Sequence, residues 1–149
     1  MLIIERVAWL RSADIFADTP DYVLASIAQV LEQVNVLAGE TFITAGDAGD
    51  CMYIIVDGSV RVHLGEHTIA TLGAGEAVGE FAVLDPEPRS ASVTANEEAA
   101  LFRLDKAAFD EAMADRPEIA ASVIRVLVRR LRTQTAARAL GPAVASEPQ

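Results

Sequence analysis

Apolar positions repeat at helical spacing near both ends of the chain, and short alternating runs separated by turn residues fill the middle. Over residues 20–34 the repeat predicts one buried helix face, made of Val23, Ile27, Val30, Leu31 and Val34. We expect Thr19 to cap this helix and Pro20 to take its first position. The same periodicity predicts a shorter helix over residues 3–10, followed by a bend over residues 12–16.

The C-terminal third of the chain returns to helical periodicity. Asp105 is placed to cap a helix over residues 106–114, and Pro117 to open a longer one. The apolar stripe of the longer helix comprises Ile119, Val123, Val126, Leu127 and Leu131. Its arginines are Arg125, Arg129, Arg130, Arg132 and Arg138, and we expect them to form a solvated face rather than a nucleic-acid patch. Gly141 and Pro142 are expected to end this helix and to leave residues 141–149 as a disordered tail.

The middle of the chain has the pattern of short strands. Eight of the nine glycines fall between residues 39 and 79, and Asp57-Gly58 is a strong tight-hairpin dipeptide. Strands are predicted over residues 41–44, 52–56, 59–64, 67–72, 91–95 and 100–104. In the third of these, alternation places Val60, Val62 and Leu64 on one face, and Arg61 and His63 on the other. Many short strands at near-regular spacing predict an antiparallel sandwich or barrel.

Composition narrows the class of protein. The chain has 149 residues, with 12 Lys and Arg against 22 Asp and Glu, and a formal net charge of −10. This length suits one domain, which we place at residues 1–140: helical over 1–34, β over 35–104 and helical over 105–140. The hydrophobic fraction of 52% excludes a disordered chain. The negative charge argues against general affinity for DNA, RNA or anionic lipid.

Cysteine usage and the N-terminus bear on location. Cys51 is the single cysteine, so an intrachain disulfide and a metal site built from several cysteines are both excluded. The N-terminus lacks the order of basic and apolar residues found in a signal peptide. Charged residues interrupt every apolar run well short of the ~20 residues of a membrane helix. We therefore expect a cytoplasmic protein that does not enter a membrane.

Residues 73–93 carry the candidate chemistry. Gly79 opens a short helical piece, whose backbone amides suit an anion. Arg89 follows closely, and its guanidinium offers a fixed fork of donors to a phosphate. Glu80 is unfavourable beside an anion unless it accepts a hydrogen bond, for which a sugar hydroxyl is a natural donor. Together these groups suggest a ligand that contains both a phosphate and a ribose.

Several motifs share one resemblance. The turns over residues 38–42 and 46–50 and the strand and hairpin over residues 52–60 precede Gly79-Glu80-Phe81-Ala82 and Pro88-Arg89-Ser90-Ala91. Over nearly all of residues 12–138, this arrangement resembles the cyclic nucleotide-binding domain family, of the kind found in cAMP receptor proteins and protein kinase A regulatory subunits. The last two motifs, over residues 79–91, resemble the phosphate-binding cassette of that family, and we call this segment the cassette. The resemblance implies a mainly β fold of the α+β class: an eight-stranded antiparallel β-roll, or jelly roll, with N-terminal helices and C-terminal lid helices.

The resemblance also implies roles for individual residues. Glu80 would accept a hydrogen bond from the ribose 2′-hydroxyl, and Arg89 would pair with the cyclic phosphate. The rest of the anion cradle would be Gly79, the amides of Phe81 and Ala82, Ser90 and the amide of Ala91. Val62 and Leu72 would form part of an apolar wall against the base. Lid contacts from the last helix would fall to Arg130, Gln134 and Thr135.

Two positions bear on the size of the pocket and the choice of base. Phe81 stands where the family more commonly has a smaller aliphatic residue, so its ring is expected to narrow the pocket. Ser90 is compatible with the phosphate of cAMP or cGMP and with a guanine. The residues therefore leave the base open, and cAMP is favoured by its frequency in the family.

The implied function is that of a sensor. The chain would bind a cyclic nucleotide, with no cofactor, and transmit its occupancy through movement of the C-terminal helix. The sequence ends at Gln149 without room for a helix-turn-helix. We therefore expect a stand-alone bacterial regulatory module with no DNA-binding region. Its output would pass to an effector protein in trans, or through a homodimer with a two-fold seam along the C-terminal helix.

Less specific interpretations remain beside this one. Arg89 is also explained as a surface arginine paired with Asp85 or Glu87, and Glu80 as a solvated turn carboxylate. The chain would then be a degenerate β-roll that serves as an interaction or scaffold protein and binds no nucleotide.

Catalysis and metal binding are not favoured. His63 and His67 are the two histidines of the chain, so the third histidine of metal-dependent β-roll enzymes is absent. Both are expected to be exposed residues at strand ends. Val78 occupies the third glycine position of a dinucleotide fingerprint, and Asp47 and Asp50 suit a tight turn better than a Ca²⁺ loop. No nucleophile motif is present, so we expect no catalytic residue and no metal site.

Overall fold

The computed structural model describes the backbone of residues 1–145 and the side chains of residues 1–139. Three helical elements come first: α1 (Ile3–Arg11), the 3₁₀ turn η1 (Asp14–Phe16) and α2 (Asp21–Ala28). The strands are β1 (Glu32–Val36), β2 (Thr41–Ile43), β3 (Ala48–Gly49), β4 (Cys51–Asp57), β5 (Val60–Leu64), β6 (His67–Leu72), β7 (Ala77–Val78), β8 (Glu87–Pro88), β9 (Ser92–Ala95) and β10 (Ala99–Asp105). A second 3₁₀ turn, η2 (Glu80–Val83), lies between β7 and β8. The helices α3 (Lys106–Asp115) and α4 (Glu118–Ala145) complete the fold.

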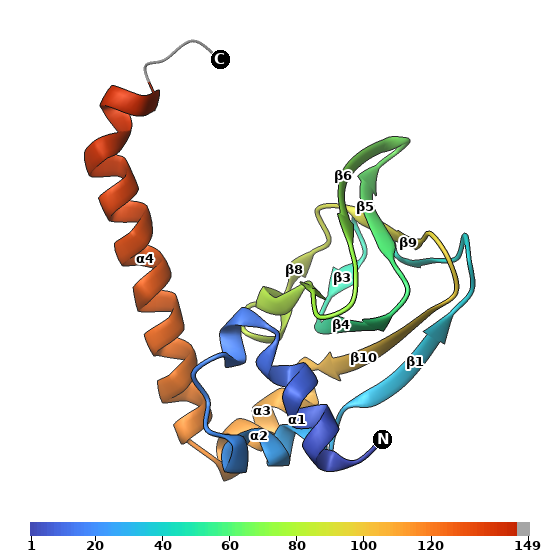
Figure 1. Cartoon of the computed structure of the whole chain (residues 1–149), viewed down its shortest axis with the longest axis horizontal. Helices are drawn as coiled ribbons and strands as arrows, with labels where there is room; N and C mark the ends of the chain where they lie inside the picture. Colours follow the sequence, from blue (N-terminus) through green and yellow to red (C-terminus); the bar gives the residue numbers. More distant parts are fainter. Residues whose placement is uncertain (146–149) are drawn as a thin grey trace.

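The strands form antiparallel sheets that curl into a roll. One sheet has the order β1-β10-β4-β7 and another β2-β9-β5-β6, while β3 and β8 pair as a short ribbon. In Figure 1 the roll stands above α1, α2 and α3, and α4 rises from these helices on the other side of the molecule. The expected α+β architecture is confirmed. Within the described residues, the structure divides the roll into ten strands, three of them two residues long, where the resemblance implied eight.

Strand β4 is central because both of its faces are buried. Met52 and Ile54 face the helices, whereas Tyr53 and Ile55 face the interior of the roll. Alternation with period two sends successive side chains to opposite sides, so an unbroken apolar run is what a strand between two cores requires. The antiparallel neighbour β10 divides its side chains in the same way, with Phe102 toward the helices and Leu101 toward the roll interior.

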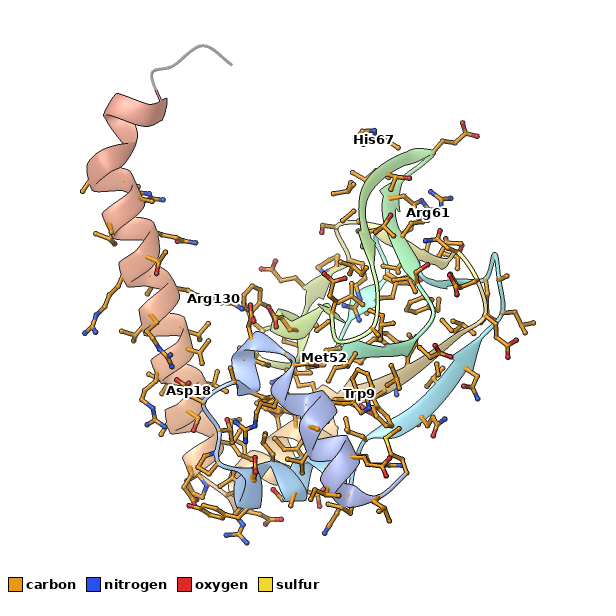
Figure 2. The ribbon with its side chains drawn as sticks, viewed as in Figure 1. Trp9, Asp18, Met52, Arg61, His67 and Arg130 are labelled. Atoms are coloured by element: carbon orange, nitrogen blue, oxygen red, sulfur yellow. The ribbon has the colours of Figure 1, made fainter. Side chains whose placement is uncertain are left out.

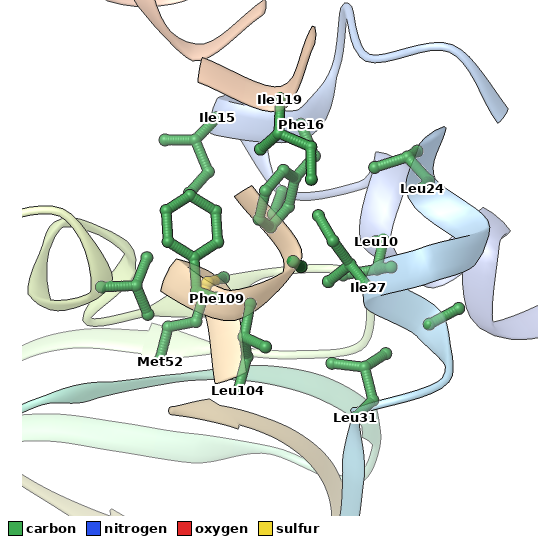
Figure 3. Packing of buried hydrophobic residues seen from close by; sticks show 14 of the residues in the cluster. Leu10, Ile15, Phe16, Leu24, Ile27, Leu31, Met52, Leu104, Phe109 and Ile119 are labelled. Atoms are coloured by element: carbon green, nitrogen blue, oxygen red, sulfur yellow. The ribbon is translucent and has the colours of Figure 1, made fainter. Parts of the chain in front are cut away.

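The helical core joins the two ends of the chain. Figure 3 shows Phe16 and Phe109 packed among aliphatic side chains from α2, β4 and β10. The two rings have centroids 6.0 Å apart at an interplanar angle of 49°, and both side chains are fully buried. This core fixes η1 and α3 against the sheet and so provides a rigid base beneath α4.

The N-terminal expectations need two corrections. Helix α2 ends at Ala28, and Val34 lies on β1, which pairs with β10 from Glu32 to Val36. The predicted helix extended too far because Val34 fits the helical repeat, while the β-branched residues Val34 and Val36 also fit the period of two that is typical of a strand. Thr19 is not the cap, because Pro20 takes the cap position instead of the first helical position. The Pro20 carbonyl accepts hydrogen bonds from the amides of Val23 and Leu24, whereas the buried Thr19 hydroxyl has no hydrogen-bond partner.

The C-terminal helices differ from expectation at two ends. Asp105 occupies the cap position of α3 but makes no capping bond; its Oδ2 accepts a hydrogen bond from Arg103 Nη1 at 3.4 Å instead. Helix α4 continues past Gly141 and Pro142 to Ala145. A proline removes one backbone donor and weakens or bends a helix, yet the backbone on both sides of Pro142 keeps helical geometry. The remainder of the expected tail, residues 146–149, lies outside the described residues.

Helix α4 carries two apolar stripes rather than one. Ile119, Val123 and Val126 are buried against the helical core, and Leu127 is half-buried. A second stripe faces solvent, with Ile124, Val128 and Leu131 exposed to 59%, 37% and 61%. Leu131 therefore does not belong to the packed stripe, and every described side chain from residue 131 to residue 139 is exposed.

His63 is not an exposed strand-end residue. It is buried on β5, where its Nδ1 donates to the Gly65 carbonyl at 2.8 Å and its Nε2 lies 2.7 Å from the Thr94 hydroxyl. The Thr94 hydroxyl in turn lies 2.7 Å from that of Thr41 on β2. Both ring nitrogens thus have partners, which explains how a polar ring is accommodated under cover. His67 is exposed, as expected.

Two features are absent from the described residues. No helix there is both long and apolar enough to cross a membrane. Nor does this part of the chain bring together three or more His, Cys, Asp or Glu side chains in a position to hold a metal ion.

The Phe16–Phe109 contact generates a stability prediction. Phe109→Ala is expected to lower the free energy of unfolding by about 3–5 kcal/mol, because it leaves a cavity in a core with no access to water. Urea unfolding followed by circular dichroism measures the change. Ile69→Ala, at a position that is 53% exposed, is the control and should change stability by less than ~0.5 kcal/mol. Similar losses in both variants would contradict this account of the core.

Candidate functional site

A left-handed glycine shapes the turn after β7. Gly79 has φ 73° and ψ 25°, and the 3₁₀ turn η2 begins at the next residue. Non-glycine residues avoid this backbone region, so the turn depends on Gly79. Within the turn the Ala82 amide donates to the Gly79 carbonyl at 2.9 Å. The expected helical piece is therefore present, although the Ala82 amide is engaged inside it.

The backbone of Arg89 is held by the turn between β2 and β3. Its amide donates to the Asp47 carbonyl at 2.8 Å, and its carbonyl accepts from the Gly46 amide at 2.8 Å. The ribbon of β3 and β8 continues this pairing through Gly49 and Glu87. Asp47 thus has a structural role in a tight turn, as expected.

The side chain of Arg89 reaches back beneath Gly79. Its Nη2 donates to the Cys51 carbonyl at 2.6 Å and lies 3.3 Å from the Cys51 Sγ. Within residues 1–139, where side chains are described, Arg89 makes no ion pair with any carboxylate. This holds for its neighbours Asp85 and Glu87 as well. The interpretation of Arg89 as a surface residue paired with a neighbouring carboxylate therefore finds no support.

Two glycines make room for this arginine. A Cβ atom on Gly79 would lie 2.3 Å from Arg89 Nη1, and one on Gly49 would lie 3.1 Å from both Arg89 Cδ and Nε. Gly49 is also tight against the backbone, because its Cβ would lie 2.5 Å from the Glu87 carbonyl oxygen. The guanidinium is thus placed by the absence of side chains at positions 49 and 79.

A cavity of about 390 Å³ opens over this arrangement. It is lined by residues 77–82, Asp85, Glu87, Pro88, Arg89 and Ser90. Its chemistry combines one guanidinium and one hydroxyl with three carboxylates, those of Glu80, Asp85 and Glu87. Arg89 supplies the positive charge for an anion, and an ionised carboxylate in the same cavity offers hydrogen-bond acceptors to hydroxyl groups.

Glu80 is connected to the last helix. Its Oε1 accepts a hydrogen bond from Arg130 Nη2 at 3.0 Å, and the same nitrogen lies 3.0 Å from Oδ2 of Asp14 on η1. The Arg130 guanidinium also lies over the Phe81 ring, 5.0 Å from its centroid, at the distance of a cation–π contact. Figure 2 shows Arg130 on the side of α4 that faces the rest of the chain.

Most of the expected site residues come together, and some do not. Gly79, Glu80, Phe81, Ala82, Arg89 and Ser90 line one cavity. Ala91 and the expected base wall of Val62 and Leu72 are not among its lining residues. Val62 and Leu72 are half-buried and pack against the core of the roll. Leu72 also lines an adjoining cavity of about 260 Å³, together with Glu80, Ala77 and Asp14. Phe81 is 49% exposed, so its ring stands at the rim.

The lid residues also divide. Arg130 contacts the cavity through Glu80, as described above. Gln134 lines a separate cavity of about 410 Å³ between η1 and α4, together with Thr133 and Asp14. Thr135 is exposed and lines neither cavity.

Sequence reasoning missed three contributors. Cys51 supplies a carbonyl to Arg89, Gly49 makes space for it, and Asp14 shares Arg130 with Glu80. Gly49, in the turn-rich run over residues 46–50, was a usable signal of this contact, because a close approach between backbone and side chain is one reason for glycine in a strand. The contact of Asp14 had no signal, since it joins residues 116 positions apart.

Two groups close to Cys51, Tyr53 and Arg103, have raised pKa values. Burial raises the pKa of Tyr53, Cys51 raises it further, and Arg103 opposes the rise. Burial lowers the pKa of Arg103, but Cys51, Tyr53 and Asp105 together raise it above its ordinary value. Tyr53 therefore stays protonated and Arg103 stays charged at physiological pH, so neither group is suited to proton transfer there.

The close approach of Arg89 to Gly79 makes a prediction about stability. Gly79→Ala is expected to lower the free energy of unfolding by about 1–2 kcal/mol from the left-handed backbone alone, and further because the new Cβ displaces the guanidinium. Urea unfolding of this variant in the wild-type and Arg89→Ala backgrounds separates the two effects. The loss should be smaller when Arg89 is absent.

Gly73→Ala is the matched control for this pair. No atom lies within 4 Å of the position of its Cβ, and its φ lies outside the left-handed region. We expect no loss of stability from this substitution. An equal loss for Gly79→Ala in both backgrounds would show that the guanidinium does not occupy the space beside Gly79.

Known proteins share both the sequence pattern and the fold. The family model described as "Cyclic nucleotide-binding domain" matches residues 33–116. The CRP-like cAMP-activated global transcriptional regulator of Mycobacterium tuberculosis is 34% identical over 128 residues, which cover 83% of this chain and 57% of the regulator. The cAMP-dependent protein kinase regulatory subunit of Dictyostelium discoideum is 35% identical over 115 residues, covering 72% of this chain and 33% of the subunit.

A solved structure supports the same assignment. The N-terminal domain of a transcriptional regulator from Streptomyces coelicolor aligns with a TM-score of 0.82 and 31% identity, covering 87% of this chain and 96% of that one. The chain thus spans a third to somewhat over half of the length of these curated relatives, but nearly all of this solved domain. With the cassette geometry described above, these matches show that the chain belongs to the cyclic nucleotide-binding domain family.

Proposed function

We propose that this chain is a regulatory module that binds a cyclic mononucleotide, cAMP in preference to cGMP, and passes its occupancy to a partner through α4. The observation that carries the proposal is the position of Arg89, whose guanidinium lies beneath the Gly79 turn in a cavity also lined by Glu80. The action proposed is binding without catalysis or a cofactor. We place it in the cytoplasm, where a lone cysteine remains reduced.

The geometry suits a ribose cyclic phosphate. Arg89 would pair with the phosphate, and the Ser90 hydroxyl at the cavity wall would add a hydrogen bond. The Phe81 and Ala91 amides remain part of the proposed cradle; the Ala82 amide would have to leave its bond to Gly79 to join it. Glu80 would accept a hydrogen bond from the ribose 2′-hydroxyl. This bond would offset the unfavourable position of a carboxylate close to the phosphate.

The preference for adenine is supported by the relatives. The mycobacterial regulator and the kinase subunit are both named for cAMP. In this chain Ser90 is compatible with either base, as noted above. The apolar wall of Val62 and Leu72 stays part of the proposal for a bound base. Both residues are half-buried on β5 and β6, and Leu72 lines a cavity together with Glu80.

Transmission is proposed to run through Arg130. It is a residue of α4 that contacts both Glu80 and the Phe81 ring. A ligand that binds to Glu80 would therefore alter the contact between Arg130 and Glu80, which connects α4 to the cassette. A ligand shifts such an equilibrium only by the difference between its affinities for the two positions of the helix. Gln134 and Thr135, one turn further along α4, are the other proposed lid residues.

The partner is proposed to be a second copy of this chain or an effector protein. Ile124, Val128 and Leu131 form a solvent-facing stripe at positions i, i+4 and i+7, which is the spacing of a helix–helix seam. A two-fold dimer would cover this stripe in both copies. The exposed stripe favours the homodimer along α4, and an effector protein is the alternative outcome.

Ligand binding is tested by titration calorimetry with cAMP and cGMP. The wild-type chain should bind cAMP more tightly than cGMP, and a hundredfold excess over the dissociation constant should stabilise the fold by ~2.7 kcal/mol. Arg89→Ala should weaken cAMP binding by about tenfold or more, because a charge-assisted hydrogen bond is lost. Thermal melting with millimolar nucleotide provides an independent measurement.

Arg61→Ala is the matched control. Arg61 lies half-buried on β5 and does not line the cavity, so its removal changes the net charge equally and should leave the affinity near that of the wild type. If neither nucleotide releases heat or shifts the melting temperature of the wild-type chain, the proposal fails, and a β-roll interaction protein without a nucleotide becomes the better description.

Self-association is tested by sedimentation velocity over a range of concentrations. Leu131→Glu should shift the wild-type chain from dimer to monomer, because a carboxylate at a covered seam is costly. Ile69→Glu introduces the same charge at an apolar residue of β6 that is 53% exposed, and it should leave the dimer intact. A wild-type chain that sediments as a monomer at all concentrations would leave the stripe to an effector protein.

A further inference from the structure

Arg130 is shared between two carboxylates in different environments. One of them, Glu80, has a side chain that is 20% exposed and belongs to the cassette; the other, Asp14, is 76% exposed and belongs to η1. Both oxygen atoms lie 3.0 Å from the same nitrogen, Nη2. Arg130 therefore divides its charge between the cavity lined by Arg89 and a residue of the N-terminal turn that does not line that cavity.

The charge of Arg130 matters because the cavity is acidic. Glu80, Asp85 and Glu87 line it, against the single guanidinium of Arg89. An incoming phosphodiester is repelled by these carboxylates, and Glu80 must stay ionised next to it in order to accept a ribose hydroxyl. Arg130 offsets the charge of Glu80, and any part of its interaction that is drawn toward Asp14 weakens this offset.

Asp14 is held in a fixed place. The two residues after it, Ile15 and Phe16, are fully buried, and the Phe16 ring packs on that of Phe109. A cavity of about 410 Å³ on the Asp14 side of Arg130 gives the arginine room to move. The backbone of Asp14 is thus fixed, and its carboxylate offers Arg130 an alternative partner to Glu80.

We propose that Asp14 is a positioning residue that sets the cyclic nucleotide affinity by competing with Glu80 for Arg130. The inference rests on the proposed function. When Asp14 holds Arg130, the acidic cassette is less well neutralised and the ligand binds less tightly. When Arg130 pairs with Glu80 alone, the ligand binds more tightly. The N-terminal turn thereby tunes a site whose phosphate-binding arginine, Arg89, lies in a cavity that Asp14 does not line.

A neighbouring ion pair provides a matched control. Asp18 pairs with Arg129, the residue before Arg130 on α4. Asp18→Asn removes the same charge from the same loop and also frees an arginine of α4, but this arginine does not contact Glu80. A general electrostatic gain from removing an acidic residue near an anion would appear in both variants, whereas a gain through Arg130 would appear in Asp14→Asn alone.

The test is titration calorimetry with cAMP on the full chain. Asp14→Asn should bind cAMP about two- to fivefold more tightly than Asp18→Asn, a range set by the value of an exposed ion pair. Asp14→Glu, which keeps the carboxylate, should retain the wild-type affinity. In an Arg130→Gln background, Asp14→Asn should give no more gain than Asp18→Asn.

The outcomes separate the two proposals. A wild-type chain that does not bind cAMP or cGMP overturns the proposed function itself. A wild-type chain that binds, with Asp14→Asn and Asp18→Asn equal in affinity, overturns the role of Asp14 and leaves the proposed function in place. A gain from Asp14→Asn that persists undiminished in the Arg130→Gln background would also overturn it. Thermal melting of each variant confirms that it is folded.

Discussion

The contact between the Arg89 guanidinium and the bare backbone of Gly79 is the constraint on which the site depends. The arginine reaches the cassette because positions 49 and 79 lack side chains, and it stays there because the Cys51 carbonyl accepts a hydrogen bond from it. Cys51 belongs to β4, which is buried on both faces. A strand that is buried on both faces thus fixes the charged group of the cavity, which is the preorganisation that a binding site needs.

Arg130 joins three parts of the molecule. It lies on α4, contacts the cassette through Glu80 and Phe81, and contacts the N-terminal turn through Asp14. An arginine suits this position because its planar group donates in several directions and also stacks on a ring. The first turns of α4 pack on the helical core, and the described side chains after residue 130 are exposed. The contacts of Arg130 therefore stand at the point where the packed part of α4 passes into its exposed part.

Local pattern was enough for the parts of this structure that depend on local chemistry. The β6 strand, the Asp57-Gly58 hairpin and the turn at Gly79 follow from alternation and glycine, and the cassette follows from its motif. The boundary between α2 and β1 was wrong because apolar residues fit both periods there, and tertiary pairing with β10 decided between them. The partners of Arg89 and Arg130 were missed because they come from segments far apart in the chain.

Residues 131–139 of α4 bury no side chain, and this has an energetic consequence. From residue 131 to residue 139 no side chain is buried, so helical order there relies on intrinsic propensity, to which Ala136, Ala137 and Ala139 contribute. Such turns fray readily in water, and their amides should exchange hydrogen far sooner than those near Val123. Whatever binds this segment must therefore also supply the free energy that keeps it helical.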